Sequence, residues 1–174
     1  IIDDLLMLSR LEQKEGHVMT ETATISTVIE NAIYLCQLQA AKKTIKIDVV
    51  CPENLEFSIN APLLEQALVN LIVNAIKYSE PDKKVLIIAE QEAKQVVIYI
   101  KDEGFGIERK HVDRRFERFY RVDTARSRKL GGTGLGLSIV KHIVQAHEGT
   151  IRVESKVGSG TTFIISLPST PEAV

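Results

Sequence analysis

The first residues of the chain alternate apolar and charged positions at the spacing of an amphipathic helix that ends near Gly16. The apolar side of this helix consists of Ile1, Ile2, Leu5, Leu6, Leu8 and Leu11. A helix of about three turns is too short to be stable alone in water. We therefore interpret residues 1–16 as the end of a longer helix that belongs to a bundle or a coiled coil.

Helical spacing of apolar residues returns further along the chain. Residues 25–43 predict a helix whose inner side consists of Ile25, Val28, Ile29, Ala32, Ile33, Leu35 and Cys36. The next helix runs from Asn60, which can cap it, to about Tyr78, with Pro62 in its first turn. Its core side consists of Leu64, Ala67, Leu68, Leu71, Ile72, Ala75 and Ile76. The last predicted helix covers residues 135–146, before Gly149.

Shorter apolar runs and alternating positions predict the strands. We expect them at residues 21–24, 45–50, 55–59, 85–91, 96–102, 150–155 and 161–167. Strand pairs mixed with helices favour an α+β fold, in which helices cover one face of a mixed, mostly antiparallel sheet. Residues 169–174 are expected to form a tail after the last strand.

Two asparagines interrupt the otherwise apolar helix that follows Asn60. Asn70 and Asn74 are four residues apart, in line with Gln66 and next to Lys77 and Tyr78. Buried amides are costly unless a partner satisfies them. One interpretation is that they form hydrogen bonds to neighbouring loops. The other is that their oxygens face a hydrated Mg²⁺ ion while Lys77 faces phosphate.

Glycines cluster at three places, each next to a predicted helix or strand. Asp102, Gly104 and Gly106 come directly after an apolar strand, where a carboxylate can accept a hydrogen bond from an exocyclic amine such as that of adenine. The alternative is a plain turn. Residues 131–137, which read GGTGLGL, lead into a helix, and helix N-termini bind phosphate. Neither a Walker A loop nor a Rossmann fingerprint is present. Residues 158–160 fit a hairpin turn.

A long polar stretch joins the glycine cluster after Asp102 to the one at residues 131–137. It contains the sequence FERFYR at residues 116–121 and the basic run RSRK at residues 126–129. A connection of this length is uncommon in a compact domain and is often a lid over a site. Its arginines can reach a triphosphate, or they can be solvated surface charges.

The composition excludes several function classes. Hydrophobic residues make up 44% of the 174 residues and charged residues 26%, which is ordinary for a globular domain. The formal net charge of −1 argues against a nucleic-acid partner. Cys36 and Cys51 lack the spacing of a metal site, so we expect free thiols in a reducing compartment.

The order of these motifs resembles that of the sensor histidine kinases. An asparagine-containing helix is followed by DEGFG, FERFYR, GGTGLGL and GSGTTF, similar to the N, G1, F, G2 and G3 boxes of that family. The likeness covers about residues 20–167, and the first helix resembles the second dimerisation helix of these kinases. The resemblance implies a Bergerat-type two-layer α/β sandwich, shared with DNA gyrase and the heat-shock chaperone ATPases.

The resemblance also implies a role for each matching residue. Asn74 corresponds to the main Mg²⁺ ligand and Asn70 to a second one. With Lys77 and Arg121, which correspond to phosphate contacts, they form the expected catalytic group. Asp102 corresponds to the residue that reads adenine. The expected contacts to ATP are Asn74, Lys77, Tyr78, Asp102, Gly104, Gly106, Ile107, Gly132, Thr133, Gly134, Leu135, Gly136 and Thr161.

Asn70 narrows the expected reaction. Members of the wider class that hydrolyse ATP carry a glutamate at this place, which activates water, whereas an asparagine side chain cannot act as a general base. The resemblance therefore implies transfer of the γ-phosphoryl group to a protein histidine by positioning and charge stabilisation.

None of the chain's histidines has the neighbours of the family's phosphoacceptor, which is followed by an acidic residue and later by Thr-Pro. We expect structural or solvated roles for His17, His111, His142 and His147. The resemblance implies as partners a dimerisation and phosphoacceptor domain and the receiver domain of a response regulator. Arg115 departs from the family, which usually has an apolar residue there.

The expected organisation has three parts: the end of a dimerisation helix at residues 1–16, a catalytic ATP-binding domain at 17–168 and a tail at 169–174. We expect a cytoplasmic domain, monomeric by itself, of a homodimeric protein anchored in the bacterial cell membrane. One alternative is an anti-sigma-type serine kinase with the same fold. Another is a nucleotide-binding or docking module without activity.

Overall fold

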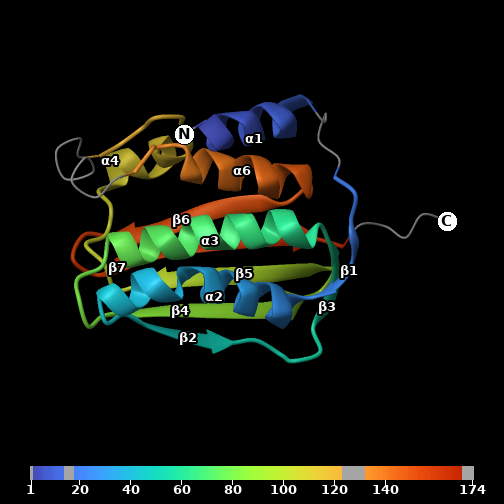
Figure 1. Cartoon of the computed structure of the whole chain (residues 1–174), viewed down its shortest axis with the longest axis horizontal. Coiled ribbons are helices and arrows are strands. Elements are labelled where there is room, and N and C mark those ends of the chain that lie inside the picture. The colour runs from blue at the N-terminus through green and yellow to red at the C-terminus, as the bar shows by residue number, and fades with distance from the viewer. Residues whose placement is uncertain (1, 14–17, 123–131, 170–174) are drawn as a thin grey trace.

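The computed structural model describes residues 2–13, 18–122 and 132–169. Its helices (Figure 1) are α1 Ile2–Gln13, α2 Ile25–Lys42, α3 Ala61–Lys77, α4 Arg109–Val112 and α6 Gly136–Ala146, with a 3-10 turn η1 at Asp113–Phe116. The strands are β1 Glu21–Thr24, β2 Lys46–Val50, β3 Glu56–Ile59, β4 Lys84–Glu92, β5 Gln95–Asp102, β6 Thr150–Lys156 and β7 Gly160–Pro168. Each predicted strand is present to within one residue at either end.

The main sheet has the strand order β2-β4-β5-β7-β6. Strand β2 pairs parallel with β4, and every other pair in the sheet is antiparallel. Strands β1 and β3 form a separate antiparallel pair. The predicted mixed, mostly antiparallel sheet is therefore confirmed.

Helices α2, α3 and α6 lie side by side over one face of this sheet (Figure 1). The side chains between the two layers are apolar and fully buried, among them Leu68 and Leu71 of α3 and Ile87, Ile98 and Ile100 of the sheet. Burial of these side chains is the main force that holds the layers together. The expected two-layer α/β sandwich is confirmed.

The start of α3 is fixed by hydrogen bonds. The side-chain oxygen of Asn60 accepts a hydrogen bond from the backbone N–H of Leu63 at 3.1 Å, which confirms the predicted cap. The backbone N–H of Asn60 donates to Nε2 of His147 at 3.0 Å, and Nδ1 of His147 lies 2.8 Å from the carbonyl oxygen of Ile143. Burial lowers the pKa of His147, which suits a neutral ring that accepts through Nε2. His147 thus ties α3 to the end of α6.

One detail of the hydrophobic pattern was wrong: Leu35 of α2 was expected on the inner side, but 59% of it is exposed. In β2, Val49 is 40% exposed. The buried face of α2 is narrower than the apolar face in its sequence, and β2 is an edge strand with a neighbouring strand on one side only.

The short helix α4 and the turn η1 were not predicted, because their sequence is polar. Phe116 at the end of η1 packs edge-on against Phe163, with ring centroids 6.4 Å apart.

Helix α1 lies along α6 (Figure 1). Leu8 is buried in this contact, whereas Ile2 and Leu6 are 75% and 52% exposed. Helix α1 therefore packs part of its predicted apolar side against the domain, and the rest of that side is exposed to solvent.

Both cysteines are free thiols, as expected, and burial raises the pKa of Cys36 to about 11. Across residues 2–13, 18–122 and 132–169, no helix has the length and hydropathy that a bilayer crossing requires.

Candidate functional site

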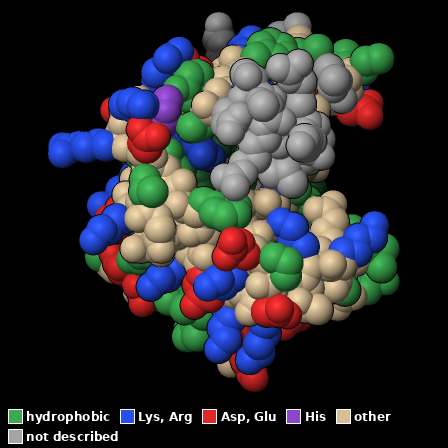
Figure 2. All heavy atoms as spheres, turned by 90° about the vertical axis from the view of Figure 1, so that its left-hand side faces the viewer, with side chains coloured by type: hydrophobic (Ala, Val, Ile, Leu, Met, Phe, Trp, Pro, Cys, Tyr) green, Lys and Arg blue, Asp and Glu red, His purple; other side chains and the backbone are tan. Residues whose placement is uncertain are grey.

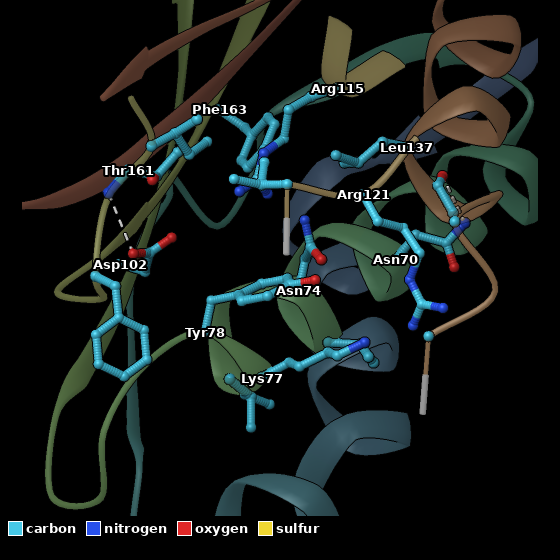
Figure 3. Close-up of a pocket in the computed structure, with 18 of the residues that line it drawn as sticks. Asn70, Asn74, Lys77, Tyr78, Asp102, Arg115, Arg121, Leu137, Thr161 and Phe163 are labelled. Carbon is cyan, nitrogen blue, oxygen red and sulfur yellow. Dashed lines mark hydrogen bonds between the residues drawn. The ribbon is translucent and has the colours of Figure 1, made fainter. Parts of the chain in front are cut away.

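A cavity of about 640 Å³ opens beside the C-terminal half of α3. Figure 3 shows the side chains that line it, which come from α3, the end of β5, η1, β7 and the loop before α6. This volume falls within the usual range for small-molecule sites. The cavity therefore gathers the motifs that the sequence analysis singled out.

Asp102 is the buried acid at one end of the cavity. Its Oδ1 accepts hydrogen bonds from the backbone N–H groups of Gly104 and Thr161, at 2.8 and 3.1 Å. Desolvation raises the pKa of Asp102, while these two hydrogen bonds and the charge of Arg115 oppose the shift. With Oδ1 occupied, Oδ2 is the atom that can accept a hydrogen bond from a ligand.

Two glycines with positive φ hold the backbone around Asp102 tightly together. Gly106 has φ +74°, and a Cβ there would lie 2.1 Å from the carbonyl oxygen of Lys156. Gly160 has φ +92°, and a Cβ there would lie 2.0 Å from the carbonyl oxygen of Asp102. Each contact is far inside the van der Waals limit, so both positions require glycine. These glycines allow close approach between backbone segments.

Asn70 and Asn74 behave differently on α3. The Asn70 side chain accepts a hydrogen bond from Gln66 at 3.2 Å and donates one to the carbonyl oxygen of Gly136 at 3.3 Å. Asn70 therefore fastens the start of α6 to α3. Asn74 also lines the cavity and lies between Tyr78 and Asn70 in Figure 3.

Two basic side chains meet at the other end of the cavity. A Cβ at Gly132 would lie 2.3 Å from Nζ of Lys77 and 3.8 Å from a terminal nitrogen of Arg121. Figure 3 shows Lys77, Arg121 and Asn70 on the side of the cavity away from Asp102 and Thr161. Close cations at the start of a helix form a site suited to an anion.

Lys43 of α2 fixes the end of α3 and was not found from the sequence. Its Nζ donates hydrogen bonds to the carbonyl oxygens of Ile76, Lys77 and Ser79, at 3.0, 2.9 and 2.9 Å. Desolvation lowers the pKa of Lys43. A cation that satisfies free carbonyl groups at a helix C-terminus stabilises it. The only signal in the sequence was a lysine at a predicted helix end.

The loop before α6 is held from two directions. The backbone N–H of Phe119 donates to the carbonyl oxygen of Gly134 at 3.0 Å, and Gly134 has φ +77°. The hydroxyl of Thr133 accepts from the N–H of Leu135 at 3.2 Å and donates to the carboxylate of Asp4 in α1 at 3.3 Å. The FERFYR segment and α1 therefore both touch the glycine loop.

Helix α1 also contacts the FERFYR segment and α6 by charge. Arg118 forms an ion pair with Glu12, and Nε2 of His142 lies 3.7 Å from the same carboxylate. Desolvation, together with the charges of Arg118 and Lys141, lowers the pKa of His142. These groups are partly exposed, so their contribution to stability is small.

Arg115 of η1 lines the cavity on the side of Asp102. Its guanidinium carbon lies 5.3 Å from the centroid of the Tyr78 ring. Its charge interacts with Asp102 and Tyr78, and desolvation lowers its pKa. The sequence showed Arg115 as a departure from the resemblance but not its place in the cavity.

A family model decides the identity of this fold and cavity. The model of the histidine kinase-, DNA gyrase B-, and HSP90-like ATPases matches residues 59–171. The chain belongs to this ATPase family. The match covers α3, the end of β5 and both glycine loops, which supply most of the residues that line the cavity.

Within this family, the chain is similar to sensor kinases. It is 40% identical over 173 residues to the sensor-like histidine kinase SenX3 of Mycobacterium tuberculosis, covering 99% of this chain and 42% of that protein. It is 40% identical over 170 residues to the sensor protein kinase WalK of Staphylococcus saprophyticus, covering 97% of this chain and 28% of that protein. The chain thus spans less than half the length of these relatives.

Solved structures of histidine kinases have the same fold as this chain. The catalytic domain of histidine kinase ThkA superposes with a TM-score of 0.78 at 27% identity, covering 89% of this chain and 99% of that one. The Acinetobacter baumannii histidine kinase AdeS gives a TM-score of 0.81 at 26% identity, covering 98% and 77%. The domain is therefore a catalytic ATPase domain of the sensor histidine kinase type, and no comparison supports the serine kinase alternative.

The structure brings most residues predicted for the ATPase site together. The cavity is lined by Asn70, Asn74, Lys77, Tyr78, Asp102, Gly106, Ile107, Arg121, Gly132, Thr133, Gly134, Gly136 and Thr161. Gly104 and Leu135 are not among the lining residues. Leu135 is fully buried in the core, and Gly104 leaves room for the carbonyl oxygen of Tyr78. The basic run at residues 126–129 lies outside the described residues.

The surface beside the ATPase site mixes charges of both signs. Figure 2 shows Lys and Arg side chains interspersed with Asp and Glu at this end of the molecule. The described histidines are tied to protein groups: His111 to the hydroxyl of Tyr120 at 2.5 Å, His142 to Glu12, and His147 to Asn60. Of the structural or solvated roles expected for the histidines, His147 has the structural one, whereas His17 lies outside the described residues.

Proposed function

We propose that this domain binds Mg-ATP with the base at Asp102 and the phosphates at Lys77 and Arg121, and transfers the γ-phosphoryl group to a histidine of a dimerisation helix. The observation that carries this proposal is the polarity of the cavity, which has a buried carboxylate acceptor at one end and clustered cations at the other. Adenine has an exocyclic amine and a triphosphate is an anion, so ATP matches both ends. Full-length ShkA, at 26% identity and a TM-score of 0.84, was solved in complex with AMPPNP, which supports the proposal.

Mg²⁺ fits the residues present. Among the described residues, no group of three or more His, Cys, Asp or Glu side chains is placed to hold a metal. A site made of one amide oxygen, ATP phosphates and water suits Mg²⁺, which keeps several of its waters. Asn74 would supply that oxygen, because Asn70 already accepts a hydrogen bond from Gln66. Bound Mg²⁺ would neutralise phosphate charge.

The residues around the phosphates support transfer rather than hydrolysis. Asn70 is not a base, and its amide bridges Gln66 and Gly136. Lys77 and Arg121 would stabilise charge on the phosphoryl group as it moves. The nucleophile would be an imidazole nitrogen of the acceptor helix, which attacks the γ-phosphorus as the bond to the β-phosphate oxygen breaks, so that ADP leaves.

The partners follow from the same proposal. We propose that the acceptor histidine lies in a dimerisation and phosphoacceptor domain continuous with α1, and that the phosphoryl group then passes to an aspartate of a response regulator receiver domain. The whole protein would be a homodimer anchored in the bacterial cell membrane, with this domain on the cytoplasmic side. The same proposal assigns residues 1–16 to the dimerisation domain and 17–168 to the catalytic domain.

A phosphotransfer assay tests the proposed reaction. The chain is incubated with γ-labelled ATP, Mg²⁺ and a separate dimerisation domain that contains a histidine followed by an acidic residue. We expect label on that domain that is lost in acid and retained in base, as phosphohistidine requires. Acid-stable phosphoserine would favour the serine kinase, and no label with intact ATP binding would leave only a binding module. Either result would overturn the proposal.

A further inference from the structure

Arg115 has an unusual environment for an arginine. It lies at the rim of the ATPase cavity in η1, next to exposed Arg114. Its Nε has almost no accessible surface and has no hydrogen-bond partner within the part of the chain that the structure describes. A buried donor without a partner is costly and rare in native proteins. Arg115 therefore carries a largely desolvated guanidinium at the edge of the cavity, with one N–H that the described residues leave unsatisfied.

The neighbours of Arg115 are the groups of the base end. Its guanidinium faces the Tyr78 ring at 5.3 Å, and its charge interacts with Asp102. Figure 3 shows Arg115 beside Phe163 and on the same side of the cavity as Thr161, whereas Lys77 and Arg121 lie on the opposite side. Arg115 is thus separated from the cations that meet at Gly132.

A purine ring matches what Arg115 offers. A planar guanidinium stacks on aromatic faces, and a purine presents both such a face and ring nitrogens that accept hydrogen bonds. The positive charge also favours the ionised form of Asp102, which is the form that accepts two hydrogen bonds inside the protein and a further one from an amine. An apolar residue at this position would provide neither the donor nor the charge.

We propose that Arg115 is a specificity-determining contact for the purine base, with its guanidinium stacked on the ring. This proposal rests on the proposed function, since it requires the base of ATP to lie at the Asp102 end. It makes Arg115 a contact to the base and not to the phosphates. The affinity that Arg115 provides is therefore independent of the number of phosphates.

The test measures how AMP, ADP, ATP and tripolyphosphate displace a fluorescent ATP analogue from the full chain. Arg115→Met keeps the length of the side chain and removes the guanidinium. We expect it to weaken AMP, ADP and ATP by the same factor, about 3- to 30-fold, and to leave tripolyphosphate unchanged. Arg109→Met, which changes an exposed arginine of α4, is the matched control and is expected to bind all four as the wild type does.

The outcomes separate this proposal from the proposed function. A loss of affinity that grows from AMP to ATP would make Arg115 a phosphate contact, and unchanged or tighter binding of AMP would remove it from base recognition; each overturns the inference alone. A wild-type chain that binds no nucleotide overturns the proposed function as well. Arg115→Lys keeps the charge but not the planar group or Nε, and is expected to lose most of the same affinity. Wild-type affinity in this variant would contradict the stacking role.

Discussion

The two ends of the ATPase cavity are built in different ways. The end at which we propose that the base binds is held by backbone groups: Oδ1 of Asp102 accepts two backbone N–H groups, and Gly106 and Gly160 bring neighbouring segments into contact. The phosphate end is made of side chains, and it is touched by α1, where Asp4 accepts a hydrogen bond from Thr133 and Glu12 pairs with Arg118. In the proposed function, the Asp102 that accepts from the base is thus held by the sheet and its turns, whereas the end proposed for the phosphates depends on contacts that α1 can alter.

The largest expected effect comes from the carboxylate at the base end. In Asp102→Asn the side-chain oxygen can still accept from Gly104 and Thr161, but the other atom becomes a donor that opposes the amine of adenine. We expect the domain to fold and its affinity for ATP, measured by calorimetry, to fall by about 100-fold. Asp3→Asn on the exposed side of α1 is the control. Equal affinities for the two variants would count against the base end as assigned.

The next largest effect is expected at Asn74, the proposed Mg²⁺ ligand. Asn74→Ala is expected to weaken ATP binding at least about tenfold in the presence of Mg²⁺, and little when EDTA replaces the ion. Asn31→Ala, which changes an exposed asparagine of α2, should behave as the wild type in both conditions. If Asn74→Ala weakens binding equally with and without Mg²⁺, then Asn74 does not hold the ion.

Lys43 supports the helix end that carries Lys77. Lys43→Met leaves three carbonyl oxygens without their cation, so we expect the free energy of unfolding to fall by about 1–3 kcal/mol. Urea denaturation provides the measurement. Lys46→Met removes an exposed lysine that pairs with Asp48, and is expected to change stability by less than about 1 kcal/mol. A similar loss of unfolding free energy in both variants would show that the three hydrogen bonds of Lys43 do not stabilise the domain.

Acid should reveal the burial of Asp102. Because desolvation raises its pKa above the usual value of 3.8, the folded chain binds more protons than the unfolded chain between that value and the raised one. As the pH falls through this window, the wild type gains stability relative to Asp102→Asn. Unfolding measured in parallel on both proteins checks the sign. A wild type that instead loses stability relative to the variant would mean that its hydrogen bonds outweigh its burial.

The smallest effect is expected at the contact with α1. Glu12 and Arg118 are both partly exposed, so Glu12→Gln should change the free energy of unfolding by less than about 1 kcal/mol. A loss of more than about 2 kcal/mol would show that α1 is firmly attached to the phosphate end, and the contrast between the two ends would no longer hold.

The sequence predicted the fold well where one physical rule dominated. Alternation gave each strand to within one residue, and the side chain of Asn60 identified the start of α3. Hydrophobic periodicity gave the wrong burial for Leu35, because the spacing of apolar residues does not tell how wide a face of the helix the neighbouring elements cover. Hydrophobic periodicity also failed to predict α4 and η1, because their polar residues have no periodic pattern.

For the site, the sequence predicted the residues whose types are unusual for their place, such as Asn74 in an apolar helix and Asp102 after a buried strand. It could not predict Lys43 or Arg115, because each acts through segments distant in the chain. Lys43 reaches carbonyl groups more than thirty residues away. Arg115 meets Tyr78, which lies in another element. Such contacts depend on tertiary packing, which a single sequence does not display.

The most direct test of the central claim is a crystal structure of the domain with Mg²⁺ and a non-hydrolysable ATP analogue. The account predicts the exocyclic amine of adenine within hydrogen-bond distance of Oδ2 of Asp102, and the terminal phosphate at Lys77 and Arg121. An analogue bound with its base at Gly132, or bound outside this cavity, would contradict it.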